Sequence, residues 1–409
     1  MTDTACLKKV LIEDLALFGG PPCFKERVHV GRPNLIAREQ LLGRINDILD
    51  RQRLTNNGPE VKALESAIAQ YVGVKNCIAV CNGTAGLEIA VRALGLAGEV
   101  IVPAFTFIAT AHVLQWLGIR PVFCDIDPKT HNVDPRQIEK LMTDQTTGII
   151  GVHLWGRPCE IETLESLADK HHLKLLFDAA HAFGCSYKNK MIGNFGHAEV
   201  FSFHATKFFH TLEGGAVLTN DDVLAQKLRL MRNFGFQGYD NVVSLGINAK
   251  MNEISAAVGM TLFEHRDDLF RVNRQNYQQY ETLLADIPGV RLTAYDESQK
   301  SNYQYIVIEI DEKKTGLHRD QFFEILDAEN IAVRRYFYPG CHQAEPYRSR
   351  AMGPNHALPQ TDALAANVLC LPNGNSVTAQ DIRRICHLIK FIMAQGPALK
   401  NLLSKRKGE

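Results

Sequence analysis

The chain has 409 residues, which is long for a single domain and sufficient for two, each with a sizeable buried core. Its 45 Lys and Arg residues balance 45 Asp and Glu residues, so the overall charge gives no basis for binding nucleic acid or an anionic membrane. The sequence has no apolar run near the roughly 20 residues that cross a bilayer. Glu13 and Asp14 interrupt the segment where a signal peptide would be apolar. We therefore expect a soluble, cytoplasmic protein.

The ten cysteines are scattered along the chain and form no CxxC pair or regular framework. In a chain of this size, that distribution is typical of an intracellular protein. We expect them to be reduced thiols, most of them buried.

From residue 76 to residue 220, short apolar runs alternate with segments of helical periodicity. The strand-like runs are "NCIAV", "EVIVP", "RPVFCDID", "TGIIGVHL" and "LKLLFDAA". Runs rich in Val and Ile that are separated by helices predict an α/β fold with a mostly parallel sheet. The last two runs, "EVFSFH" and "GAVLTN", follow with little helix between them, so part of the sheet is expected to be antiparallel.

A long helical stretch, residues 252–284, leads into a second pattern. The segments "YQYIVIEI", "RDQFFEILDAEN", "AVRRYFYP" and "TAQDIRRICHLIKFIMAQ" predict a smaller α+β domain. We place the boundary within the linking helix. The predicted domains are residues 1–265, a large domain that includes the N-terminal segment, and residues 266–409, a small C-terminal domain.

The first strand-like run is followed by "CNGTAGLE", where Gly83 permits a tight turn and Thr84 and Ala85 begin a helix. A helix N-terminus offers free backbone N–H groups and the positive end of a dipole, which together suit a phosphate. An ordinary helix start with Thr as its capping residue has the same pattern. These residues alone leave both interpretations open.

Asp178 ends another apolar run, in "FDAAHAFG". A carboxylate in that place is partly buried and needs a partner. It can cap a following helix, or it can pair with a protonated heteroaromatic nitrogen and hold it in the charged form. His181, three residues on, could pack on or hydrogen-bond to the same ring, or it could be structural.

Lys207 lies in "EVFSFHATKFFHTLEGGAVLTN", after Ser202 and before the glycine pair 214–215. A lysine is usually a solvated surface charge, but one with a lowered pKa serves as a Schiff-base nucleophile. The glycines would then let the backbone approach a cofactor. With the helix start at Thr84 and Asp178, Lys207 completes the set that pyridoxal 5'-phosphate requires: N–H donors for the phosphate, a carboxylate for the ring nitrogen and an amine for the aldehyde.

These segments resemble the DegT/DnrJ/EryC1/StrS family of sugar aminotransferases, which are pyridoxal 5'-phosphate enzymes of fold type I. The resemblance runs from about residue 31 to residue 396 and includes "NGTAGLEIAVRALGL", "FDAAHAFG", "FSFHATK", "GGAVLTN" and "INAKMNEISAAVGM". Further segments, among them "GVHLWGRPC" and "YFYPGCHQAEPYR", are similar to members that aminate C4 of a dTDP-linked keto sugar.

The resemblance implies a role for each matching residue. The Schiff-base lysine is Lys207, and the partner of the pyridine nitrogen is Asp178. The aromatic ring stacked on the cofactor is Phe107. The phosphate ligands are Thr84, Ala85 and Ser202. Asn248 would reach the cofactor of the partner subunit in a homodimer with composite active sites. At His181 many relatives have Gln, so its role is open between stacking on the ring and contacting the cofactor 3'-oxygen.

The implied reaction converts dTDP-4-keto-6-deoxy-D-glucose and L-glutamate to dTDP-4-amino-4,6-dideoxy-D-glucose and 2-oxoglutarate. Some relatives carry histidine in place of the lysine and dehydrate the sugar, so Lys207 favours transamination. An aminotransferase for a 3-keto sugar, or for a UDP- or GDP-linked keto sugar, stays open. So does a non-catalytic regulatory protein that binds pyridoxal phosphate. The histidine pairs 171–172 and 204/210 lack cysteine or carboxylate partners at ligand spacing, so no metal site is expected.

Overall fold

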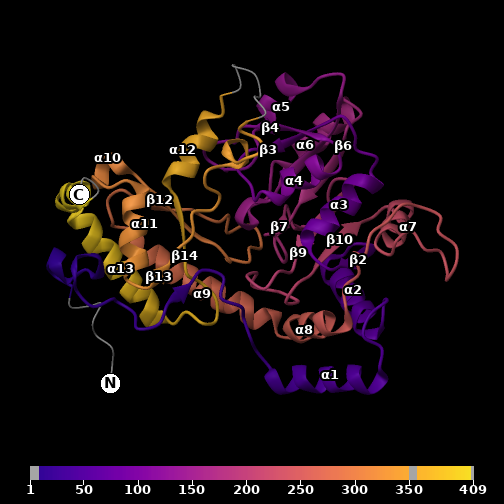
Figure 1. The fold of residues 1–409 in the computed structure, drawn as a ribbon, viewed down its shortest axis with the longest axis horizontal. Helices are drawn as coiled ribbons and strands as arrows, with labels where there is room; N and C mark the ends of the chain where they lie inside the picture. Colours follow the sequence, from indigo (N-terminus) through magenta and orange to yellow (C-terminus); the bar gives the residue numbers. More distant parts are fainter. Residues whose placement is uncertain (1–8, 350–356, 407–409) are drawn as a thin grey trace.

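The computed structural model describes residues 9–349 and 357–406. A larger part is built around a seven-stranded sheet, and a smaller part contains a three-stranded sheet. Helices α8 (Glu253–Glu264) and α9 (Arg266–Leu284) run from the larger part into the smaller one (Figure 1). The expected α/β architecture with a smaller α+β unit is confirmed.

The large sheet is parallel except at one strand. Its strands in spatial order are β2 (Asn76–Val80), β10 (Gly215–Thr219), β9 (Ala198–Ser202), β6 (Lys174–Asp178), β5 (Thr146–Val152), β3 (Glu99–Pro103) and β4 (Arg120–Cys124). Strand β10 is antiparallel to both of its neighbours, and the other neighbouring pairs are parallel. The expected antiparallel portion is therefore the final strand of the series.

Helices cover both faces of this sheet. They are α2 (Pro59–Val72), α3 (Gly83–Ala93), α4 (Ala109–Trp116), α5 (Pro135–Leu141), α6 (Ile161–Lys170) and α7 (Asp222–Met231), while α1 (Arg38–Arg51) packs on α8. Successive strand residues point to opposite faces. Accordingly, Leu175 belongs to one buried cluster, with Leu64 of α2, and Leu176 to another, with Ile89 of α3. Both faces are buried, which explains the continuous apolar runs.

The smaller part has its own core. Its antiparallel sheet consists of β11 (Val290–Leu292), β12 (Ile306–Ile310) and β14 (Val368–Leu371), and its helices are α10 (Glu312–Thr315), α11 (Arg319–Ala328), α12 (Pro359–Asn367), α13 (Ala379–Ala394) and α14 (Gly396–Arg406). Short elements complete the chain: hairpin strands β7 (Ser186–Tyr187) and β8 (Lys190–Met191), and 3-10 helices Ile12–Asp14, Ala16–Phe18, Leu154–Gly156 and Cys341–Gln343.

The N-terminal segment packs on the smaller part, although the sequence assigned it to the larger domain. Leu15 and Phe24 belong to the buried cluster of the smaller part. Strand β1 (Val28–His29) pairs in parallel with β13 (Ile331–Ala332). The boundary near residue 265 remains a prediction, and the break between α8 and α9 falls at His265.

The cysteines largely follow the expectation, with one exception. Eight of them are free, and seven of these are buried. Cys23 is disulfide-bonded, so the expectation of reduced thiols is wrong for this residue. Cys6 lies outside the described residues.

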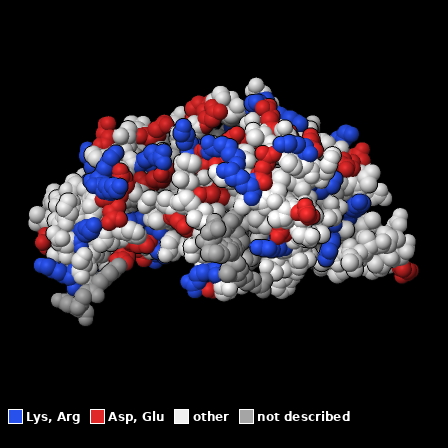
Figure 2. Space-filling model, turned by 90° about the horizontal axis from the view of Figure 1, so that it is seen from above, with Lys and Arg blue, Asp and Glu red and all other residues white. Residues whose placement is uncertain are grey.

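Acidic and basic side chains are interspersed on the face shown in Figure 2, in keeping with the balanced composition. Within residues 9–349 and 357–406, no helix combines the length and the apolar character that a membrane crossing needs.

Candidate active site

A pocket of about 470 Å³ lies where strands β6 and β9 end and helix α3 begins. Ligands in parallel α/β sheets bind at the carboxyl ends of the strands. Of the residues expected from the sequence, six line this pocket: Thr84, Phe107, Asp178, His181, Ser202 and Lys207. The fold therefore brings together residues that span more than 120 positions of the chain.

Lys207 follows strand β9 and extends into the pocket, where its side chain is half-buried. Burial lowers the pKa of its amine to about 8, and the negative charge of Asp178 acts in the opposite direction. The amine donates a hydrogen bond of 3.1 Å to the hydroxyl of Tyr305. The amine of Lys207 is therefore held in a pocket by a hydrogen bond and is not a solvated surface charge.

Asp178 is buried at the end of β6. Its Oδ2 accepts a hydrogen bond of 2.8 Å from the hydroxyl of Thr110, and its Oδ1 accepts one of 3.1 Å from the backbone N–H of Ala180. Burial raises the pKa of this carboxyl, while both hydrogen bonds and the charge of Lys207 lower it. Turns, and not a helix, follow Asp178, so its role as a helix cap is excluded. A buried carboxylate in a pocket suits a cationic partner.

His181 is buried, and one hydrogen bond to its ring shows which ring nitrogen carries the hydrogen. The backbone N–H of Trp155 donates to Nδ1 at 3.1 Å, so Nδ1 is unprotonated and the ring hydrogen is on Nε2. Burial holds the pKa of His181 well below its usual value, which keeps the ring neutral. Its ring stacks on Phe337 with centroids 5.7 Å apart. His181 therefore offers a hydrogen-bond donor at the pocket, which suits an oxygen acceptor.

The start of helix α3 differs in detail from the expectation. The capping residue is Asn82, not Thr84, and its Oδ1 accepts a hydrogen bond of 2.8 Å from the N–H of Ala85. That N–H is therefore already paired, and a phosphate would have to share or replace this bond. The first-turn N–H groups of Gly83 and Thr84 are the ones without an intrahelical acceptor. Both residues line the pocket.

Two glycine positions explain how the backbone closes around this end of the sheet. A Cβ at Gly83 would lie 3.0 Å from the Cβ of Ser202, so glycine lets the serine approach the helix start. A Cβ at Gly215 would lie 2.6 Å from the carbonyl oxygen of Phe201 and 2.9 Å from the nitrogen of Gly83. Neither Gly214 nor Gly215 lines the pocket. Gly215 therefore permits close packing of strands and helix. The expectation that this pair lets the backbone approach a cofactor stays a prediction.

Phe107 and Asn248 occupy contrasting positions. Phe107 lines the pocket with a side chain that is 54% exposed, so a face of its ring is accessible to a ligand. Asn248 is exposed and does not line the pocket of its own chain. Its predicted role, toward a partner subunit's cofactor, stays a prediction.

The smaller part of the molecule contributes pocket residues that were not predicted from the sequence. Tyr305, Arg334, Tyr336 and Phe337 line the pocket from the smaller part. They lie about 100 or more positions after Lys207, and no local pattern connects them to it. Two features of the sequence could have indicated these pocket residues: the polar and aromatic residues that begin "YQYIVIEI", and the basic and aromatic run "RRYF".

The donor set fits pyridoxal 5'-phosphate. Lys207 offers an amine, Asp178 a buried carboxylate and His181 an N–H donor. The helix start and Ser202 offer phosphate donors, and Phe107 offers an aromatic face. The close approach of Ser202 to Gly83 places hydroxyl and backbone donors together.

Comparisons with known proteins agree with this arrangement. Residues 36–390 match the DegT/DnrJ/EryC1/StrS aminotransferase family. The chain is 37% identical over 365 residues to a dTDP-4-amino-4,6-dideoxy-D-glucose transaminase of Shigella dysenteriae, covering 89% of this chain and 99% of that protein. It is 34% identical over 365 residues to the GDP-perosamine synthase of Caulobacter vibrioides, covering 88% of this chain and 96% of that protein.

Solved structures extend the similarity to the whole fold. A crystal structure of DesI, described in the presence of its TDP-sugar product, superposes with a TM-score of 0.92 at 46% identity and covers 97% of this chain and 100% of that chain. Helicobacter pylori PseC, an aminotransferase of pseudoaminic acid biosynthesis, gives a TM-score of 0.84 at 27% identity, with coverage of 90% and 100%. The expected fold type is confirmed.

Proposed function

Because the chain belongs to the DegT/DnrJ/EryC1/StrS aminotransferase family, we propose that it moves the amino group of L-glutamate to C4 of dTDP-4-keto-6-deoxy-D-glucose, with pyridoxal 5'-phosphate as cofactor. The products would be dTDP-4-amino-4,6-dideoxy-D-glucose and 2-oxoglutarate. The observation that carries the proposal is that one pocket holds the amine of Lys207, with its pKa lowered to about 8, and the buried carboxylate of Asp178.

When bound, the cofactor would supply an aldehyde that condenses with amines and a ring that accepts the electrons left when a C–H proton departs. Lys207 would hold it covalently through Nζ, and Asp178 would face the ring nitrogen. His181 would donate its Nε2 hydrogen to the 3'-oxygen of the cofactor. Ser202 and the N–H groups of Gly83 and Thr84 would bind the phosphate.

Lys207 is suited to proton transfer once an amino donor has displaced it. A base must be unprotonated, and an amine with a pKa of about 8 is neutral in a useful fraction of molecules at neutral pH. Asp178 carries the complementary charge: a cation at its carboxylate would stabilise its ionised form against the effect of burial. The two residues thus provide a mobile proton and a fixed negative charge.

The choice of substrate draws support from the relatives and from the shape of the pocket. The Shigella dysenteriae relative is named for the proposed product, and the DesI structure is described with a TDP-sugar product. A second hollow of about 510 Å³ shares Phe107, Arg334, Tyr336 and Phe337 with the pocket. The two hollows therefore adjoin at these residues, and the guanidinium of Arg334, an exposed residue, suits an anionic ligand.

A GDP-linked keto sugar is the second candidate substrate. The observation that favours it is the 34% identity to a GDP-perosamine synthase over nearly the whole chain. The same pocket chemistry would serve either nucleotide, because the reacting atoms are in the sugar.

We also propose a homodimer with composite active sites. An arm beyond α7, residues 234–247, exposes large apolar side chains that would be covered by a partner: Phe234, Phe236, Tyr239, Val242, Val243, Leu245 and Ile247. This end of the molecule shows mostly uncharged atoms (Figure 2). Apolar groups concentrated on one exposed segment are typical of an interface. Asn248 follows the arm directly, which supports its assignment to the partner's cofactor.

The test is incubation with pyridoxal 5'-phosphate, L-glutamate and either dTDP- or GDP-4-keto-6-deoxy sugar, followed by NMR of the product. We expect an amino group at C4 of the dTDP-linked sugar. Amination at C3 would refute the assigned position, and turnover of the GDP-linked sugar alone would replace the assigned nucleotide.

A further inference from the structure

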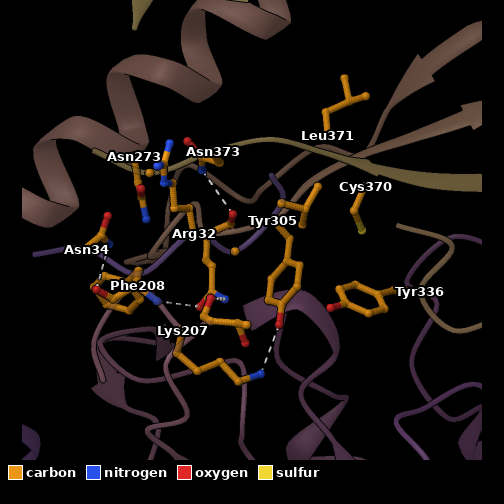
Figure 3. A pocket seen from close by; sticks show the side chains of 15 residues that line it. Arg32, Asn34, Lys207, Phe208, Asn273, Tyr305, Tyr336, Cys370, Leu371 and Asn373 are labelled. Carbon is orange, nitrogen blue, oxygen red and sulfur yellow. Dashed lines mark hydrogen bonds between the residues drawn. The ribbon is translucent and has the colours of Figure 1, made fainter. Parts of the chain in front are cut away.

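Lys207 is contacted by two consecutive residues from the other part of the chain. Gln304 and Tyr305 directly precede strand β12 of the smaller sheet. The Nζ atom of Lys207 donates to the Tyr305 hydroxyl at 3.1 Å and lies 5.7 Å from the centre of the Tyr305 ring. Figure 3 shows this contact, with the lysine amine directed at the tyrosine hydroxyl. Among the described residues, Tyr305 is the hydrogen-bond partner of this amine.

Gln304 holds the main chain on both sides of the lysine. Its Nε2 donates to the carbonyl oxygen of Thr206 at 3.3 Å, and its Oε1 accepts from the N–H of Phe208 at 3.3 Å. A side-chain amide has a donor and an acceptor at a fixed spacing. One side chain therefore fixes the residue before Lys207 and the residue after it.

Gln304 is itself fixed by two buried asparagines. Its backbone N–H donates to Oδ1 of Asn302 at 3.1 Å, and its carbonyl oxygen accepts from Nδ2 of Asn373 at 3.1 Å. Both asparagines are buried, with exposures of 0% and 7%. The position of the lysine loop is thus tied to the smaller part of the molecule through a chain of hydrogen bonds.

The chemistry of the Tyr305 contact suits an amine that changes its charge. Burial keeps the pKa of Tyr305 well above its usual value, so the phenol stays neutral. Its oxygen can accept from the ammonium form of Lys207, and its hydrogen can be donated to the lone pair of the neutral form. Hydrogen bonds to the charged form are the stronger ones.

We propose that Gln304 and Tyr305 form a holder for Lys207: Gln304 is a positioning residue for the lysine backbone, and Tyr305 binds and orients the lysine amine whenever it is free. The role in turnover rests on the proposed function, whereas the effect on the free amine does not. The holder keeps a released lysine within reach of its reaction and prevents it from turning to solvent.

The effect of Tyr305 on the amine of Lys207 is tested in full-length protein from which bound cofactor has been removed. Trace labelling with acetic anhydride over a range of pH, followed by mass spectrometry of the Lys207 peptide, gives the midpoint at which this amine becomes reactive. Tyr305→Phe removes the oxygen that accepts from the ammonium form, so we expect the midpoint to fall by about one pH unit. Tyr303→Phe is the matched control, because its hydroxyl contacts Glu297 and not the lysine; its midpoint should equal that of the unaltered protein.

Gln304 is tested by hydrogen exchange and kinetics. Gln304→Met keeps the length of the side chain and removes both hydrogen bonds, so backbone exchange in residues 205–209 should accelerate about tenfold or more. In the transamination assay, kcat should fall by about tenfold to a hundredfold with KM for the sugar within twofold. Gln279→Met, which removes an exposed amide that contacts the carbonyl of Ala379, should change none of these quantities.

The outcomes separate the two proposals. An unchanged labelling midpoint in Tyr305→Phe, or unchanged exchange in Gln304→Met, overturns the holder even if transamination is confirmed. A protein that binds no pyridoxal phosphate but shows the shifted midpoint and the faster exchange retains the holder and loses the proposed function.

Discussion

The hydroxyl of Thr110 donates a 2.8 Å hydrogen bond to Oδ2 of Asp178, although Thr110 lies on helix α4 and Asp178 ends strand β6. Together with the N–H of Ala180 on Oδ1, it fixes the plane of the carboxylate before any ligand arrives. A negative charge that is already oriented stabilises a cation without a cost of rearrangement.

Asp178→Asn should keep the shape of this group and lose its charge. We expect kcat for transamination to fall by about 10²-fold or more. The charge of Asp178 raises the pKa of Lys207, which is about 8, so the pKa of this lysine in the cofactor-free variant should be lower than in the unaltered protein. Steady-state kinetics and acetic anhydride labelling measure the two effects. A variant with full activity would show that the carboxylate does not act on the reacting groups.

Lys207→Ala should abolish turnover, with a loss in kcat of about 10³-fold or more, while the circular dichroism spectrum stays that of the folded protein. Borohydride reduction of the protein with bound cofactor, followed by peptide mapping, should label Lys207. Exposed Lys62→Ala, on helix α2, is the control and should retain activity. Labelling at another lysine would remove Lys207 from its assigned role.

Ser202→Ala should weaken binding of the cofactor through loss of one hydrogen bond to a charged phosphate. A bond of this kind corresponds to about a tenfold to a hundredfold increase in Kd. Titration of the cofactor-free protein, followed by absorbance, gives the value. Ser298→Ala alters an exposed loop of the smaller part and should leave Kd unchanged; an equal loss in both variants would point to a general effect on folding.

The lowered pKa of Lys207 predicts a pH dependence of stability. Between pH 8 and about 10.5, the unfolded chain holds a proton on this lysine that the folded protein has released. The free energy of unfolding of the cofactor-free protein should therefore rise with pH through this window, relative to Lys207→Met, and run parallel to it below pH 8. Urea unfolding at several pH values measures the difference. A constant difference across the window would show that the amine is not desolvated.

Glu329 anchors the N-terminal segment to the core of the smaller part. Its buried carboxylate accepts from Nζ of Lys9 at 2.8 Å and from the N–H groups of Ala16 and Cys23 at 2.8 and 2.7 Å. Glu329→Gln leaves the buried Lys9 without its counter-charge, so we expect a loss of about 3–5 kcal/mol in the free energy of unfolding.

A second ion pair of the N-terminal segment, which is exposed, provides the control for the loss of stability expected in Glu329→Gln. Asp327 forms an exposed ion pair with Arg27, and Asp327→Asn should cost no more than about 1 kcal/mol. Urea denaturation compares the two variants. Equal losses would mean that burial does not distinguish these two ion pairs.

The chain order of strands and helices in the larger part could be predicted from the sequence, because both periodicity and turn residues are local properties. The same holds for the residues at strand ends and at the first helix start, since a parallel sheet gathers its strand ends at one edge. Six predicted residues from Thr84 to Lys207 line one pocket for this reason.

The local sequence pattern could not predict which residue caps helix α3 or what surrounds the glycine pair 214–215. Asn82 and Thr84 are both good capping residues, and only the backbone conformation selects Asn82. The composition of Gly214 and Gly215 does not show what surrounds them, and only the structure places atoms of Phe201 and Gly83 next to Gly215.

What the sequence by itself determined was the order of the secondary-structure elements and the identity of the reactive side chains, because propensity and periodicity act over a few neighbouring residues. Only the tertiary structure decided which groups surround Lys207. Tyr305, 98 positions away, meets its amine because residues near strand β12 share a buried cluster with residues that follow strands of the larger sheet, among them Phe105 and Leu154. Such contacts depend on packing across the whole molecule. The same packing withdraws the lysine from water, and that desolvation lowers its pKa.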